Sequence, residues 1–420
     1  MKETIQEIKQ RYEQFKEKEI SLNMERGWPS KEQLDLSMPM LDLVNSQTEL
    51  CREVDYRGYA GTGGIKPIRD LFAEVLDVSA DEIYVGGTMS TTIMYDLISR
   101  AVLFGFPGYE PWKKMDKIKF ICPSPGYEKH FKICTTYDIE MLSVPILEDG
   151  PDMDIVEKMV FEDGAIKGMW CVPLYSNPTG AIYSDEVISR LAKMETKAGD
   201  FRIFWDNAYC VHHLTEEKIT IKNILHECKA CGNPDRVFEF TSTSKITFPG
   251  GGVGVCASSK ANIEWFSKST LLQLKTGDKI NQLRHVLFLK DMDGINDHMK
   301  KHRDIIKPKF DLIDRILHAQ LDEWEIAKWV NPKGGYFINL ELLPGMAKKV
   351  CQLCKEAGVM ITPAGSTFPY GMDTEDKYLR LAPTYPPIEE LEEAMELLCI
   401  AIKTVYFEIY AGGKSDGKDC

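Results

Sequence analysis

The sequence lacks a hydrophobic segment long enough to cross a membrane. A transmembrane helix needs about 20 consecutive apolar residues, whereas one of the longest apolar runs in this chain is Ala101–Phe106. Residues 1–20 are highly charged and place Ile8, Tyr12 and Phe15 on one helical stripe. That pattern is neither the apolar core of a secretory signal nor an Arg-rich transit peptide. We therefore expect a cytoplasmic protein with no membrane partner.

Basic residues are in the minority. The chain has 51 Lys and Arg against 64 Asp and Glu, a net charge of −13. Because phosphate backbones are bound by clustered cations, this balance argues against a nucleic-acid partner. A hydrophobic fraction of 44% over 420 residues is ordinary for a globular protein. It is enough sequence for roughly two or three domain-sized units, each with its own core.

The 12 cysteines suggest no disulfide framework, because they are scattered through apolar segments of a long chain. Reduced, mostly buried thiols are the better interpretation. The pairs Cys228/Cys231 and Cys351/Cys354 have C-x-x-C spacing and could together bind zinc. The second pair, however, falls in the helical pattern Met346–Ala357, where that spacing arises freely. We therefore predict no metal site.

Short β-rich runs alternate with helical patterns between residues 80 and 260. Such alternation is typical of a parallel sheet covered by helices on both faces. About seven residues separate the last two runs, too few for a crossover helix, so the last strand should be antiparallel to its neighbour. The sequence thus predicts an α/β fold with a seven-stranded, mostly parallel sheet. The expected strands are Ile83–Gly87, Lys119–Ser124, Glu140–Ile146, Gly168–Leu174, Phe201–Asn207, Val237–Ser244 and Gly252–Ser258.

The pattern changes after residue 260. A long helical region, Ile263–Gln320, is interrupted at Gly277 and Gly294 and is followed by short strands and two helices. This arrangement predicts a smaller α+β domain, on which the N-terminal helix should pack because it has no place in the parallel sheet. The expected division is residues 1–50 as an N-terminal segment on the small domain, 51–310 as the large domain and 311–420 as the small domain.

Polar residues follow the expected strands at the points where each one ends. Ligands of open parallel sheets bind at the carboxyl ends of the strands. Lys245 could form a Schiff base with an aldehyde cofactor there, and Asp206 could keep a pyridine nitrogen protonated. Asn177 and Tyr209 could hydrogen-bond the ring oxygen of that cofactor. The turn that opens the next helix could bind a phosphate, through Ser90 and Thr91 together with Ser242. These residues imply pyridoxal 5′-phosphate.

Each of these features alone has a structural explanation. Asn-Pro is usually a turn, Ser-x-Ser-Lys is usually a surface loop, and a buried Asp commonly caps a helix. Their order and their placement at successive strand ends favour the cofactor site.

In this arrangement the chain resembles the fold-type I pyridoxal-phosphate aminotransferases, over nearly its whole length. It is most similar to a bacterial aspartate aminotransferase subgroup, on the stretches Glu25–Asp35, Met94–Asp96, Cys122–Tyr127 and Gly250–Gly252. The motifs that carry the family resemblance are Tyr59 with Gly64–Arg69, Pro125-Gly126-Tyr127, Asn177-Pro178-Thr179-Gly180, Asp206-x-x-Tyr209, Ser242-x-Ser-Lys245 and Leu379-Arg380-Leu381.

The resemblance implies a role for each matched residue. Lys245 would be the Schiff-base lysine and proton shuttle, with Tyr209 beside it as a further catalytic residue. Asp206 would pair with the pyridinium nitrogen and would itself accept a hydrogen bond from His130. Tyr127 would stack on the cofactor ring.

The resemblance also implies how substrate and a second subunit bind. Arg380 would hold the substrate α-carboxylate through a bidentate fork, with Asn177 and the backbone of Gly27 beside it. Tyr59 would reach the cofactor phosphate of the neighbouring subunit, so the expected active unit is a homodimer.

The chain departs from the family at position 253. Most members have a phosphate-binding arginine eight residues after the lysine, where this chain has Val253. Backbone N–H groups of the glycine-rich turn before it could replace that contact in part. An acidic substrate also needs a second cation. The candidates Lys275, Lys279 and Arg284 lie in a segment that is equally well explained as a charged helix face.

The function expected from these residues is amino transfer between an amino acid and a 2-oxo acid, with L-aspartate and 2-oxoglutarate as substrates. Two alternatives keep the same central residues: an aminotransferase for aromatic or other amino acids, and a carbon–sulfur lyase. A third is a non-catalytic, cofactor-sensing module of a transcription regulator. It is disfavoured because only about 25 residues precede Gly27, too few for a winged helix.

Overall fold

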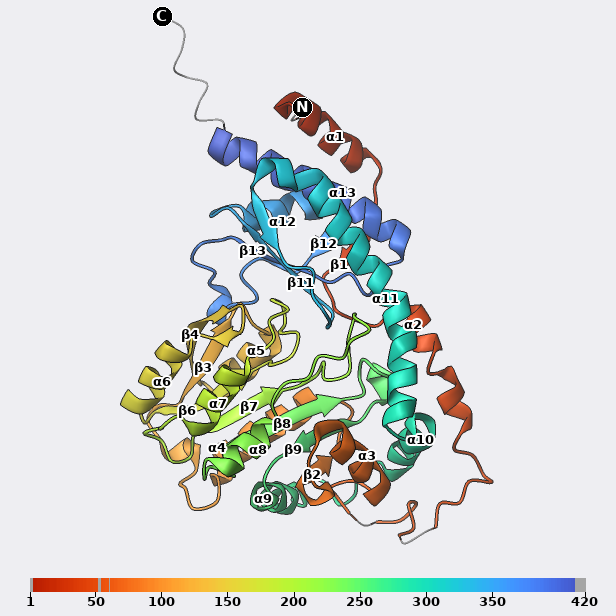
Figure 1. The fold of residues 1–420 in the computed structure, drawn as a ribbon, viewed down its shortest axis with the longest axis vertical. Helices are drawn as coiled ribbons and strands as arrows, with labels where there is room; N and C mark the ends of the chain where they lie inside the picture. Colours follow the sequence, from red (N-terminus) through yellow and green to blue (C-terminus); the bar gives the residue numbers. More distant parts are fainter. Residues whose placement is uncertain (1–2, 52–53, 60, 412–420) are drawn as a thin grey trace, which may run out of the picture.

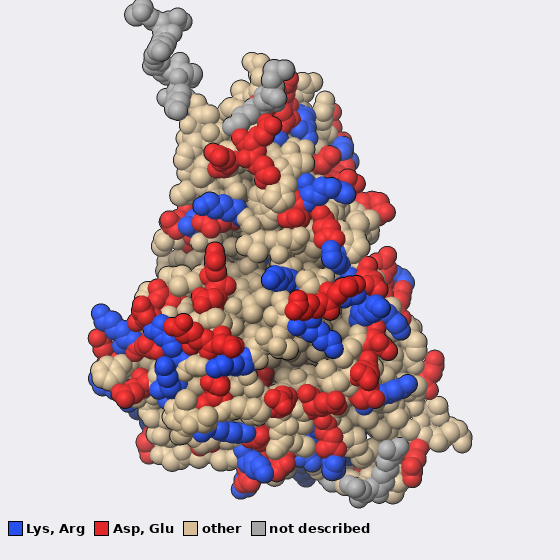
Figure 2. Space-filling model, viewed as in Figure 1, with Lys and Arg blue, Asp and Glu red and all other residues tan. Residues whose placement is uncertain are grey.

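The computed structural model describes residues 3–51, 54–59 and 61–411. The chain forms a larger lower part built on one sheet and a smaller upper part that contains both α1 and α13 (Figure 1). Acidic and basic side chains are interspersed over the face shown in Figure 2. None of the helices in the described ranges is long and apolar enough to span a bilayer.

The large sheet has eight strands in the order β2-β9-β8-β7-β6-β3-β4-β5. All seven expected strands are present, and β9 pairs antiparallel with both β8 and β2, which confirms the predicted direction of the last strand. The eighth strand, β5, has only two residues, too few to show an alternating pattern in the sequence. The strands are β2 (Ile83–Val85), β3 (Lys119–Ser124), β4 (Glu140–Leu147), β5 (Gly150–Pro151), β6 (Ile166–Cys171), β7 (Arg202–Asp206), β8 (Val237–Ser242) and β9 (Gly254–Ala257).

Helices cover both faces of this sheet because its central strands are buried on both sides. In β7, Ile203 and Trp205 point into one hydrophobic core and Phe204 into the other. One core is closed by α3 (Lys66–Leu76), α6 (Met153–Glu162), α7 (Asp185–Lys193), α8 (Ile224–Ala230) and α10 (Lys279–Leu289). The other is closed by α4 (Ser90–Phe104), α5 (Glu128–Thr136) and α9 (Lys260–Thr270).

The upper part has its own core. The N-terminal helix α1 packs against α13 and buries Ile8, Tyr12 and Phe15 there. Its sheets are β10-β11-β13, which is antiparallel, and β1-β12, which is parallel. The elements are α1 (Ile5–Glu17), β1 (Leu22–Met24), α2 (Lys31–Asp35), β10 (Ala327–Trp329), β11 (Ile338–Leu342), α12 (Ala347–Glu356), β12 (Val359–Ile361), β13 (Tyr378–Leu381) and α13 (Ile388–Tyr406).

One helix, α11 (Met292–Leu321), belongs to both parts (Figure 1). Its Ile295 lies in the core of the large sheet, whereas its Leu317 lies in the upper core. The break expected at Gly294 occurs slightly earlier, because Lys290 has a φ of 65° and Gly294 already lies in the first turn of α11. Helical backbone therefore runs without a break through residue 310.

Candidate active site

A cavity of about 440 Å³ lies at the carboxyl ends of the large sheet, below the upper part. Its walls come from the loop before α2, the start of α4, the start of α5, the ends of β7 and β8, and β13. The structure thus brings together residues that are distant in the sequence. Nine of the residues singled out in the sequence line it: Gly27, Ser90, Thr91, Tyr127, Asn177, Asp206, Ser242, Lys245 and Arg380.

Asp206 is the last residue of β7 and is 4% exposed. Its Oδ2 lies 3.0 Å from Nε2 of His130, the pairing that the family resemblance implies. The His130 ring is itself held against Trp170. The other oxygen of Asp206, Oδ1, is buried and has no hydrogen-bond partner among the described residues. Because a buried polar atom without a partner is costly, Oδ1 is available to bind a donor that enters the cavity.

Lys245 follows β8 and ends between two tyrosines. Its Nζ lies 5.0 Å from the ring centre of Tyr209 and 5.7 Å from that of Tyr336. Burial lowers the pKa of Lys245, Asp206 opposes that shift, and Arg380 adds to it. The amine is therefore neutral at a lower pH than an exposed lysine would be, which a general base or nucleophile requires.

Tyr336 was not recognised in the sequence. Its hydroxyl donates to the backbone oxygen of Lys245 at 3.3 Å and accepts from Nε2 of Gln33 at 2.8 Å. It stacks on Tyr209, whose own hydroxyl has a pKa raised well above its usual range, mainly by burial. Tyr336 lies just before β11, where the sequence shows only a Gly-Gly-Tyr turn, so no local signal marks it.

A group of hydroxyls lies at the start of α4. Ser90 begins the helix after Met89, which makes no side-chain capping hydrogen bond, so the first helical N–H groups are available to an anion. Across from them Ser242 Oγ donates to Ser244 Oγ at 3.1 Å, and Ser244 also lines the cavity. Val253 is buried, and its N–H donates to the Thr243 hydroxyl at 2.9 Å.

Arg380 lies on β13 and brings a cation from the upper part into the cavity. Its Nε donates to the Thr362 hydroxyl at 3.2 Å and its Nη1 to Oδ1 of Asn177 at 3.4 Å. Phe337 supports the flat face of the guanidinium, 4.7 Å from the ring centre. Gly27 lies against the Cζ end of the same ring, where a Cβ atom would come within 2.4 Å of Phe337 Cζ. Only glycine lets the loop approach this closely.

His130 and Tyr209 contact Asp206 and Lys245 but do not themselves line this cavity. Tyr59, Lys275, Lys279 and Arg284 do not line it in their own chain either. The Tyr59 side chain is 84% exposed, and Lys275 is absent from the described lining. Lys279 Nζ donates to the backbone oxygen of Gly58 at 2.7 Å. Arg284 Nη2 donates to a neighbouring side chain of α10, the Asn281 Oδ1, at 2.5 Å. Besides Lys245, the basic residues that do line it are Arg26, Lys129, Lys132 and Arg380.

The two C-x-x-C pairs lie apart. Cys228 is buried in the core of the large sheet and Cys354 in the upper core. Among the residues that the structure describes, no three His, Cys, Asp or Glu side chains are grouped so that they could hold a metal ion.

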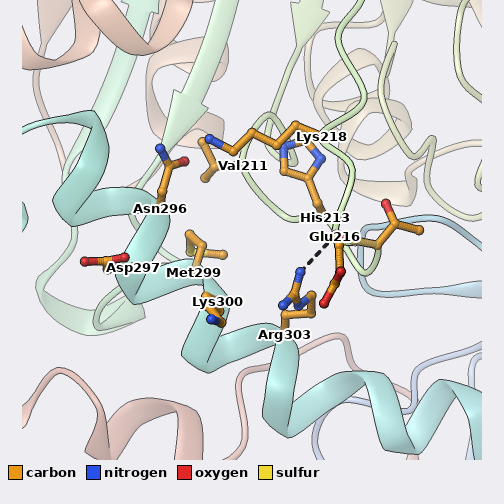
Figure 3. Close-up of a pocket in the computed structure, with 10 residues that line it drawn as sticks. Val211, His213, Glu216, Lys218, Asn296, Asp297, Met299, Lys300 and Arg303 are labelled. Carbon is orange, nitrogen blue, oxygen red and sulfur yellow. Dashed lines mark hydrogen bonds between the residues drawn. The ribbon is translucent and has the colours of Figure 1, made fainter.

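A second hollow, of about 320 Å³, lies between α11 and the loop after β7 (Figure 3). Arg303 crosses it from α11 and donates to the backbone oxygen of Thr215 at 3.1 Å. His213 points toward it from the loop but donates to or accepts from the Tyr175 hydroxyl at 2.7 Å. Its charged lining residues, Glu216, Lys218, Asp297, Lys300 and Arg303, come from this loop and from α11.

Comparison with known proteins agrees with this geometry. A family model described as "Aspartate amino-transferase" matches residues 1–413. A putative aminotransferase of Mycolicibacterium smegmatis is 44% identical over 97% of this chain and 96% of its own. An aspartate aminotransferase of Corynebacterium glutamicum is 42% identical over 97% of this chain and 94% of its own. The crystal structure of an aspartate transaminase from that species superposes with a TM-score of 0.94, covering 97% of this chain and 96% of that one.

The fold and the site define a fold-type I aminotransferase. The chain belongs to the aspartate aminotransferase family.

Proposed function

We propose that this protein is a pyridoxal 5′-phosphate-dependent aminotransferase that moves the amino group between L-aspartate and 2-oxoglutarate. The observation that carries the proposal is the unpaired Oδ1 of Asp206, which lies in the same cavity as the lysine amine of Lys245. A protonated ring nitrogen is the donor that this oxygen lacks. The relatives from Corynebacterium that are named for aspartate support the choice of substrate.

When bound, the cofactor supplies an aldehyde for covalent attachment and an electron-withdrawing ring. Asp206, oriented by His130, holds the proton on the ring nitrogen. The Lys245 amine would attach the cofactor and, once the substrate has displaced it, would take the proton from the substrate α-carbon and donate it to the cofactor. Asn177 and Tyr209 position the ring by hydrogen bonds to its oxygen, and Tyr127 supports the ring face.

Neutral groups are available to hold the phosphate of the proposed cofactor. Ser90, Thr91, Ser242 and Ser244 offer hydroxyls, and the start of α4 offers backbone N–H groups. This set supports anion binding at the helix N-terminus without the arginine that Val253 replaces.

The substrate carboxylates need two separate cations. Arg380 suits the α-carboxylate because it lies beside Asn177 and Lys245 in the cavity. Arg26 and Lys129 lie on the cavity wall and supply positive charge for a side-chain carboxylate. An aromatic side chain offers no carboxylate to these cations, which favours the acidic substrate over the aromatic alternative.

We further propose that the active unit is a homodimer. Tyr59 is nearly fully exposed and therefore available to the cavity of a second copy. The backbone of its loop lies beside the segment before α10, since Gly277 N donates to Gly61 O at 3.4 Å. Large apolar side chains are exposed on these two segments and in the first turn of α10, as expected for an interface that is covered in the dimer: Val54, Tyr59, Leu271, Leu272, Leu274 and Ile280.

The test is an absorbance spectrum of the purified protein before and after L-aspartate is added without a 2-oxo acid. A violet-region band that converts to an ultraviolet band would support the cofactor, the half-reaction and the substrate together. A band that ignores aspartate would contradict the substrate, and no band after cofactor is added would contradict the whole proposal. Lys245→Ala should show no violet band. Ammonia and pyruvate released without an acceptor would indicate the lyase instead.

A further inference from the structure

Glu128 forms an ion pair with Arg380, the residue to which the substrate α-carboxylate is expected to bind. Its Oε2 lies 2.9 Å from Nη2 of Arg380, and both side chains are largely enclosed, with 25% and 4% of their surface exposed. Glu128 is the first residue of α5, in the large-sheet part, whereas Arg380 lies on β13 in the upper part. This ion pair therefore crosses the cavity.

The Arg380 nitrogen that Glu128 contacts is one that a substrate carboxylate would also use. An arginine holds a carboxylate bidentately either end-on, through Nη1 and Nη2, or side-on, through Nε and Nη2. Nη2 is common to both forks, and it is the nitrogen that Glu128 contacts. The other two nitrogens donate to Asn177 and Thr362. A substrate carboxylate that binds through either fork therefore comes to the same nitrogen as Glu128, and the two anions meet there.

We propose that Glu128 is an internal carboxylate that the substrate α-carboxylate displaces from Arg380, and that Glu128 then pairs with Lys132. This inference rests on the proposed function, which places the α-carboxylate on Arg380. Two carboxylates on one guanidinium repel each other, so the incoming anion exchanges with Glu128 instead of adding to it. Glu128 is thus a residue that sets affinity for carboxylate substrates.

Lys132 is placed to receive the displaced side chain. It lies four residues after Glu128 on α5 and lines the same cavity. Residues four apart lie on the same face of a helix, and a glutamate N-terminal to a lysine is the favoured order. The exchange therefore moves Glu128 between two cations, and its charge remains paired in both positions.

The experiment measures binding of maleate, a dicarboxylate that cannot transfer an amino group, to the cofactor-loaded protein by calorimetry. Glu128→Gln should tighten maleate binding on the order of tenfold, because a charge-assisted contact no longer competes for Arg380. In the half-reaction with L-aspartate, the same variant should lower the half-saturating concentration and leave the maximal rate within about twofold. The matched control is Glu25→Gln, which removes an equal charge from the cavity wall without touching Arg380.

A double-mutant cycle tests the second position of Glu128. Lys132→Gln should weaken maleate binding by about twofold in the wild-type background, the range of an i,i+4 ion pair. It should have no further effect once Glu128 is Gln, because the displaced charge is gone. An equal loss in both backgrounds would show that Lys132 binds the ligand directly and would overturn the exchange.

The remaining outcomes separate this inference from the proposed function. Equal maleate affinity in the wild type and Glu128→Gln, or an equal gain in Glu25→Gln, would overturn the displacement and leave the aminotransferase proposal intact. Weaker binding in Glu128→Gln would show that Glu128 helps to bind substrate and would also overturn it. If neither protein bound maleate or any amino acid, the carboxylate site on Arg380 itself would be refuted, together with both proposals.

Discussion

The imidazole of His130 lies flat on the indole of Trp170, with ring centres 4.2 Å apart and planes 4° from parallel. This stack fixes the direction in which Nε2 meets Asp206. Because the two residues come from α5 and β6, the carboxylate is oriented by packing as well as by its own strand. One oxygen of Asp206 is bound and the other is left for the cavity.

Replacing that carboxylate tests the electron-withdrawing role of the cofactor ring. Asp206→Asn keeps the shape of the side chain but loses the charge that holds the ring nitrogen protonated. We expect kcat to fall by about 10²–10³-fold, the range found when a preorganised electrostatic contact is removed. Covalent attachment to Lys245 should persist, with a measurable absorbance band. His130→Gln, which keeps the carboxylate, should cost much less, and similar losses in the two variants would contradict this division of roles.

The cations of the cavity wall test the acidic substrate. Arg26→Gln combined with Lys129→Gln should raise the half-saturating concentration of L-aspartate on the order of tenfold, as expected for a lost charge-assisted contact. The corresponding value for L-alanine, which has no second carboxylate, should change little. Single-turnover spectra with the two amino acids measure both values. Equal effects on the two substrates would show that these residues do not discriminate between them.

The expected dimer can be disrupted at one exposed position. Leu272→Glu places a charge on a side chain that is 77% exposed and lies in the proposed interface. Light scattering should show a monomer, and activity should fall because Tyr59 no longer reaches a second cavity. Phe161→Glu is the control, since Phe161 is similarly exposed, at 60%, but lies on α6. A variant at Leu272 that remains dimeric would place the interface elsewhere.

The buried His285 predicts a loss of stability in acid. Burial lowers its pKa from 6.5 to about 4, and its Nδ1–H donates to Asn281 O at 2.8 Å. Below pH 6.5 the unfolded chain takes up a proton that the folded chain does not, so stability falls until the pH reaches about 4. Between pH 8 and pH 5 this one group should cost about 2 kcal/mol.

Urea unfolding at the two pH values measures that loss. His285→Gln removes the titrating group, so the fall in unfolding free energy between pH 8 and pH 5 should be smaller by about the same 2 kcal/mol. His318→Gln, at a half-exposed position on α11, provides the comparison. An unchanged acid sensitivity in the His285 variant would assign the effect to other groups.

The sequence predicted the strand-end residues because each follows a strongly patterned apolar run. Asp206 ends a strand in which every residue is buried, and Lys245 follows another. Polar residues that interrupt such runs are local signals, and the order of strands in an open parallel sheet brings them to one edge. These positions follow from the large sheet alone and do not depend on where the upper part of the molecule packs against it.

Features that depend on the upper part could not be predicted. The contact of Glu128 with Arg380 exists only because β13 approaches the start of α5. Tyr336 reaches the backbone of Lys245 in the same way, from the turn before β11. Neither residue lies in a motif, and no periodicity joins segments so far apart in the chain. The strand β5 was missed for a different, local reason: its two residues are too few to show an alternating pattern.

The helix α11 has a mechanical consequence for the cavity. It is a single rod whose first half is embedded in one core and whose second half is embedded in the other. Asn177 and Arg380, which meet across the cavity, therefore change their separation only as far as this rod bends. Pro308 lacks the N–H that would complete the helical ladder, but it lies between Ile306 and Phe310, in the half of the helix that is packed in the upper core. The two walls of the cavity are thereby joined by a packed helix instead of a free linker.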